Sequence, residues 1–112
     1  MAAAYSILGQ SNPAAATNAD LFSVTTAHTY VVSSLVVANV TASATNCRVY
    51  ARKAGATAAV GNAIIYDASI PANTTVTFTL GITLSGTAGD VLTVYSLAAN
   101  ALTFTAFGSD LT

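Results

Sequence analysis

Apolar and polar residues alternate along several stretches of the chain, and a period of two residues predicts β-strands. The clearest stretch is residues 75–83, where apolar side chains point one way and threonines the other. The apolar set is Val76, Phe78, Leu80 and Ile82, and the opposite set is Thr75, Thr77, Thr79 and Thr83. Residues 101–107 repeat the scheme, with Leu102, Phe104 and Ala106 inward. Both stretches therefore predict half-buried strands with a hydroxyl-bearing outer face.

Further strands are expected at 4–8, 21–26, 45–53, 63–67 and 91–97. Residues 29–38 lack clean alternation and predict a central strand that is covered on both sides. Gly, Pro, Asn or Asp mark turns between these stretches, and the short segment 98–100 predicts a hairpin between the last two strands. The expected fold class is all-β, a single-domain antiparallel β-sandwich with jelly-roll or Ig-like Greek-key topology.

The chain has 112 residues, enough for one domain with a buried core. The pattern divides it into an N-terminal arm with a short strand, residues 1–19, and a sandwich, residues 20–112. Small residues and turn formers separate the apolar Tyr5, Ile7 and Leu8 from the first firm strand. The segment is therefore either a frayed terminus or an arm whose three apolar side chains bind a neighbouring subunit.

Alternation within 45–53 places Arg48, Tyr50 and Arg52 in one row, opposite Cys47, Val49 and Ala51. Arginine and tyrosine are enriched at the energetic centres of protein interfaces. The row is accordingly a candidate partner interface, with a solvated sheet face as the alternative.

The composition restricts the possible functions. Only 6% of the residues are charged, against 54% hydrophobic, and the formal net charge is −1. Nucleic-acid binding is not expected, because neutralising several phosphates requires more than three basic residues. No membrane association is expected either, since no apolar run approaches the length of a spanning helix.

Nothing in the sequence indicates catalysis. The chain has one histidine, His28, and one cysteine, Cys47, and no nucleophile motif, metal-ligand spacing or phosphate-binding loop surrounds them. A small hydrolase that uses His28 is the least favoured possibility. We expect a protein without enzymatic activity, cofactor or bound metal.

A chain with so little charge is prone to associate when isolated, because interspersed charge normally keeps proteins soluble and apart. Exposed sheet edges add to this tendency. The composition therefore favours a structural protein that is packed among partners, including copies of itself.

An ordered series of segments along nearly the whole chain resembles small β-rich virion structural proteins of tailed bacteriophages. The segments are Leu8-Gly9-Gln10, Asp20-Leu21-Phe22-Ser23-Val24, residues 31–39, Arg48-Val49-Tyr50, Ile65-Tyr66-Asp67, residues 79–84, residues 90–95 and residues 104–110. These are strand and turn patterns rather than a chemical motif, and no functional site transfers with them.

The resemblance implies a capsid decoration (cement) protein on the outer surface of the virion. Its expected partners are the major capsid protein and copies of itself, as a trimer or dimer, and its role is to stabilise the head by bridging capsid subunits. The alternative is a tail, neck or fibre module that binds a host receptor or another virion protein.

Overall fold

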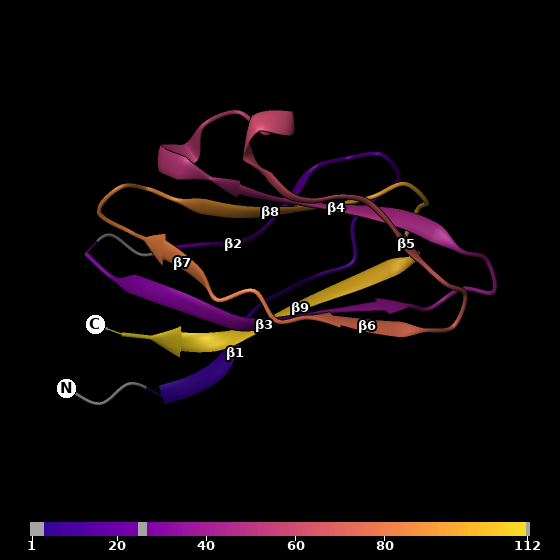
Figure 1. The fold of residues 1–112 in the computed structure, drawn as a ribbon, viewed down its shortest axis with the longest axis horizontal. Coiled ribbons are helices and arrows are strands. Elements are labelled where there is room, and N and C mark those ends of the chain that lie inside the picture. Colours follow the sequence, from indigo (N-terminus) through magenta and orange to yellow (C-terminus); the bar gives the residue numbers. More distant parts are fainter. Residues whose placement is uncertain (1–3, 25–26, 112) are drawn as a thin grey trace.

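The computed structural model describes residues 4–24 and 27–111, which form two antiparallel β-sheets packed face to face (Figure 1). The first sheet contains β1 (Ala4–Ser11), β3 (Thr29–Asn39), β6 (Thr75–Phe78), β7 (Ile82–Ser85) and β9 (Leu102–Asp110). The second contains β2 (Ala19–Ser23), β4 (Thr45–Arg52), β5 (Ala63–Ile70) and β8 (Val91–Ser96). Two short 3-10 turns, η1 (Lys53–Gly55) and η2 (Val60–Asn62), lie between β4 and β5.

The strand order is that of a jelly roll. The first sheet runs β1-β9-β3-β6, with β7 also paired to β3, and the second runs β2-β8-β4-β5. Counting β6 and β7 as one interrupted strand, the chain forms a long antiparallel ribbon in which β1 pairs with β9, β2 with β8, β3 with β6 and β7, and β4 with β5. Folding this ribbon over adds the pairs β3–β9 and β4–β8. The expected antiparallel sandwich is confirmed, and of its two possible topologies the structure has the jelly roll.

The core lies between the inner faces of the two sheets. Its largest fully buried side chains are Phe104, Leu35, Ile70, Leu84, Leu92 and Leu102. Leu102, Phe104 and Ala106 all point inward as the alternation predicts, and Thr103 and Thr105 between them are partly exposed. Apolar burial on this scale is the main stabilising contribution to a chain with so few charges.

A line of irregularities crosses the first sheet at one level. Beside Phe107 on β9, β1 carries an extra residue at Leu8 and β3 carries one at Ser33. On the far side of β3, the break between β6 and β7 falls at the same level. Bulges bend a strand and increase its twist, so this line divides the sheet into two regular halves.

Two strand predictions need correction at this line. Residues 75–83 form two strands rather than one, because the chain leaves the ladder at 79–81, where Gly81 has φ +58°. Leu80, predicted to be inward, is 45% exposed as a result. Residues 29–38 do form a central strand, but not one covered on both sides: the bulge at Ser33 shifts the alternation, and Val36 stays partly exposed.

Two connections also differ from expectation. The short segment 97–101 does not close a hairpin, because β8 and β9 belong to different sheets. The polar segment 39–46, whose composition suggests a hairpin loop, likewise carries the chain from β3 in one sheet to β4 in the other. A short connection requires only that the end of one strand lies close to the start of the next. Two strands in different sheets of a sandwich can meet this requirement as well as two neighbours in one sheet.

Residues 4–19, the described part of the N-terminal segment, belong to the sandwich rather than to a separate arm. Residues 4–11 pair along their length with β9, and the following link is tied to the rest of the fold. Asn12 donates from Nδ2 to the carbonyl oxygen of Leu102 at 2.9 Å, and Asn100 N–H donates to the carbonyl oxygen of Pro13 at 3.1 Å. Strand β1 is thus an edge strand, longer than the short strand expected at 4–8.

Gly108 provides a test of this architecture. It is buried in β9 beside the bulge of β3, and a Cβ placed there would overlap the carbonyl oxygen of Val31. Because backbone cannot swing aside as a side chain can, Gly108→Ala should lower the free energy of unfolding by about 3 kcal/mol in urea titrations. The control is Gly61→Ala, at a position with open space around it, which should change stability by less than about 0.5 kcal/mol. Equal stability of the two variants would contradict this packing.

Candidate functional site

The predicted row of Arg48, Tyr50 and Arg52 lies on β4, on the outer face of the second sheet. Unlike a solvated row, all three side chains are engaged within the chain. Tyr50 is only 4% exposed, which leaves almost none of it for a partner. The row is therefore a set of internal contacts with two partly exposed guanidinium groups, and the sequence pattern alone did not indicate this.

Arg48 is held by β5 and β8, the strands on either side of β4. Its Nε donates to Asp67 Oδ1 at 2.7 Å and its Nη2 to Oδ2 at 3.3 Å, a two-point contact with the carboxylate. The guanidinium carbon lies 4.3 Å from the ring centroid of Tyr66 and 4.6 Å from that of Tyr95. The hydrogen bonds that Arg48 donates to Asp67, with a further one to Tyr50, stabilise its charged form and raise the pKa of Arg48 further above its already high ordinary value.

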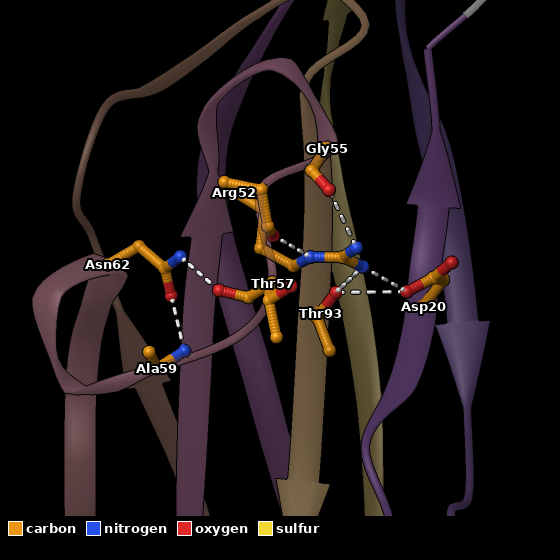
Figure 2. A network of polar contacts seen from close by, with 8 residues as sticks. Asp20, Arg52, Gly55, Thr57, Ala59, Asn62 and Thr93 are labelled. Carbon is orange, nitrogen blue, oxygen red and sulfur yellow. Dashed lines mark hydrogen bonds and ion pairs between the residues drawn. The ribbon is translucent and has the colours of Figure 1, made fainter.

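Arg52 is the centre of a second network, shown in Figure 2. Its Nη1 donates to Asp20 Oδ1 at 3.0 Å and to Thr93 Oγ1 at 3.1 Å, and Thr93 in turn donates to the same Asp20 oxygen at 2.9 Å. Its Nε and Nη2 donate to the carbonyl oxygens of Ala56 at 2.6 Å and Gly55 at 3.1 Å. One guanidinium thus ties β2, β4 and β8 to the loop that follows β4.

The loop held by Arg52 has an unusual backbone. Ala54 and Gly55 both have positive φ, at +54° and +69°. Farther along, the side chain of Asn62 accepts from Ala59 N–H at 3.0 Å and donates to the carbonyl oxygen of Thr57 at 2.9 Å (Figure 2). Side-chain hydrogen bonds of this kind supply the loop with the partners that a regular ladder would give it.

The three candidate residues of the N-terminal segment do not act together. Tyr5 is 81% exposed and Ile7 is 56% exposed, whereas Leu8 occupies the bulge of β1 and packs against the core. Ile7 lies opposite Phe107, which is 38% exposed. Tyr5, Ile7 and Phe107 therefore form an exposed apolar patch on the outer face of the first sheet, a patch that needs Phe107 from the distant end of the sequence.

Charge is distributed unequally between the two sheets. The five strands of the first sheet contain a single charged residue, Asp110. Its carboxylate lies 2.8 Å from His28 Nδ1, at the end of β9. Both Arg–Asp pairs belong to the second sheet. The chain thus presents one uncharged face and one face whose charges are already paired.

The described residues hold no cluster of three or more potential metal ligands. A cleft of about 390 Å³ opens where the end of β4 meets β7, lined in part by Arg52, Lys53 and Asp90. Asp90 is occupied by the backbone, since it accepts from Ala54 N–H at 2.9 Å and Ser85 N–H at 3.0 Å. The carboxylate of Asp90 therefore holds the backbone of the loops at Ala54 and Ser85 in place. In the described parts of the chain no helix has the length and apolar character needed to cross a membrane.

Comparison with known proteins yields little. No family model matches the chain, and no curated protein matches it. Among solved structures it is similar to a chain in the structure of infectious bursal disease virus, Gx strain, with a TM-score of 0.46 and 14% sequence identity. The match covers 96% of this chain and 31% of that one, so this chain spans less than a third of its length.

Replacing Arg52 tests the network on β4. Arg52→Ala removes the donor shared by Asp20, Thr93 and two loop carbonyls, and should lower the free energy of unfolding by about 1–3 kcal/mol. Limited proteolysis should also cut the variant faster within residues 53–62. Lys53→Ala removes the same charge from an exposed side chain and should leave both readouts unchanged. If the two variants behave alike, Arg52 does not anchor the loop.

The buried thiol gives a pH-dependent test. Burial, with a smaller contribution from the charge of Asp67, raises the pKa of Cys47 from 9.0 to about 11. The unfolded chain therefore loses this proton first, and folding stability falls as pH rises between about 9 and about 11. The stability difference between the natural protein and Cys47→Ala should narrow by about 1.4 kcal/mol per pH unit in this window. A constant difference would show that the thiol ionises equally well in both states.

Proposed function

We propose that this chain is a structural protein of a virus particle, a capsid decoration (cement) protein of a tailed bacteriophage. In this role it binds the outer surface of the head, bridges copies of the major capsid protein and associates with copies of itself. It needs no enzymatic activity or cofactor. The single observation that carries the proposal is the jelly-roll strand order in a chain with almost no charge.

The fold supports the proposal by analogy. Jelly rolls recur in viral capsids, lectins and cupins, so the fold by itself names no function. A cupin-like metal enzyme is disfavoured, because the described residues lack a metal-ligand cluster. The virion role agrees with the segment resemblance along the chain and with a rigid sandwich that offers whole sheet faces rather than a catalytic cleft.

The distribution of charge supports it as well. Arg48 and Arg52 are neutralised by Asp67 and Asp20, so little unpaired charge must be desolvated when another protein covers the second sheet. Each contact with a capsid lattice can be weak, since many copies on one shell raise the effective concentration and produce avidity. The exposed Tyr66 and Ile64 on β5 are the apolar positions on this face that we propose for capsid contact.

The second candidate is a tail, neck or fibre module that binds a host receptor or another virion protein. Exposed tyrosines beside polar groups are typical of sugar-binding surfaces, and Tyr66 lies close to Arg48 and Asp67. The stacking of Arg48 against Tyr66 and Tyr95 disfavours sugar binding, because it occupies ring surface that a sugar would cover.

Localisation in intact particles tests the proposal. Particles of the phage that encodes this chain should carry it in hundreds of copies over the head, as measured by quantitative mass spectrometry and by antibody labelling in the electron microscope. Label at a single vertex would replace the decoration role by the tail, neck or fibre role. Absence of the chain from purified particles would overturn both.

A further inference from the structure

In the part of the chain that the structure describes, the two sheets have four edges, and three of these edges are protected against pairing with another chain. Strand β2 is five residues long and carries Asp20, and β5 is broken in register and carries Asp67 with φ +53°. The β6–β7 edge is interrupted at 79–81. Short length, charge and bulges are the devices by which proteins block edge-to-edge association.

Strand β1 lacks most of these devices. It is eight residues long, contains no charged residue and no proline, and among the described residues pairs on one side only, with β9. Its one bulge, at Leu8, leaves Ala4–Ile7 as a regular stretch. In Figure 1 this strand forms the lower border of the first sheet. Its outward N–H and C=O groups are a template for one more strand.

The side chains beside this edge favour association too. Tyr5 and Ile7, on the edge strand, are exposed together with Phe107 on the neighbouring strand. An exposed apolar patch continuous with an unprotected edge is typical of an interaction site. The strands of this sheet carry no charge other than Asp110, which is paired with His28.

We propose that the β1 edge pairs with β1 of a second copy of this chain, antiparallel and about a two-fold axis, so that the two first sheets become one continuous sheet. A second copy fits this edge because a two-fold contact must be self-complementary. Antiparallel pairing of one sequence with itself meets this condition through the backbone. It also brings Tyr5 and Ile7 of both copies together without opposing like charges.

The inference rests on the self-association included in the proposed function, and adds its surface and symmetry. It is tested on the purified chain, so its failure would leave attachment to particles untouched, and failure of the particle experiment would leave the dimer untouched.

The test is sedimentation velocity over a range of protein concentrations, with lysine substitutions as gatekeepers. The natural chain should sediment as a dimer. Ile7→Lys should raise the dissociation constant at least tenfold, since the two-fold axis brings two new positive charges together. Tyr5→Lys, at a side chain that is 81% exposed and free to change without disturbing the core, should act in the same direction.

Leu97→Lys is the matched control, because it adds the same charge at an apolar side chain that is 52% exposed and lies between β8 and β9. It should remain dimeric, and circular dichroism should show the same β signal for all four proteins. A monomer at every concentration, a trimer, or equal weakening by Leu97→Lys and Ile7→Lys would each overturn the proposal.

Discussion

The mutual burial of the two inner sheet faces is the constraint on which the rest of the structure depends. With so few charges in the chain, the contact between apolar side chains such as Phe104, Leu35 and Leu92 provides most of the stabilisation. Because a shift of one residue would turn these side chains to the solvent, their burial also fixes the strand register. The bulges at Leu8 and Ser33 preserve this burial, since each restores the alternation after the level at which the sheet bends.

Once the inner faces are committed to the core, the outer faces are free to differ. In the second sheet, Arg48 and Arg52 connect neighbouring strands and a loop. Together with their partners Asp67 and Asp20 they account for most of the charged side chains of the molecule. The strands of the first sheet carry one charged side chain, that of Asp110. This first sheet exposes hydroxyls, a small apolar patch and one unprotected edge. The second sheet thus stabilises the molecule, while the first sheet offers an outer face and an edge for the association that we propose.

The sequence contained enough information for the fold class and for most strands, because alternation is a local signal and the core requires it. At Ser33 and Leu80 the structure departs from the alternation in the sequence. A bulge or a strand break depends on how all the strands of the sheet pair, and the local sequence does not report that pairing. The pairing of the N-terminal segment with β9 was not predicted, either as a frayed terminus or as an arm, for a related reason. The partner strand, β9, lies at the other end of the chain, and nothing near Tyr5 indicates that pairing.

The candidate site shows the same limit. Alternation placed Arg48, Tyr50 and Arg52 on one face correctly, but their partners could not be identified locally. Asp20 and Thr93 are 32 and 41 positions away from Arg52, and only the jelly-roll order brings them together. The sequence did not indicate that Phe107 belongs to the exposed apolar patch with Tyr5 and Ile7. The bulges at Leu8 and Ser33 set the register of β9, and this register places Phe107 opposite Ile7. A search for edge strands without charge or proline would have indicated β1 as the edge that we propose for pairing.

The central claim is that the molecule offers the β1 edge to partners while the charged sheet serves its own stability. Amide hydrogen exchange of the purified chain, followed by mass spectrometry at low and high protein concentration, tests this most directly. The account predicts that exchange in Ala4–Leu8 slows as concentration rises, while exchange in β5, the edge that carries Asp67, stays the same. Exchange in Ala4–Leu8 that is independent of concentration, or slowing confined to β5, would contradict it.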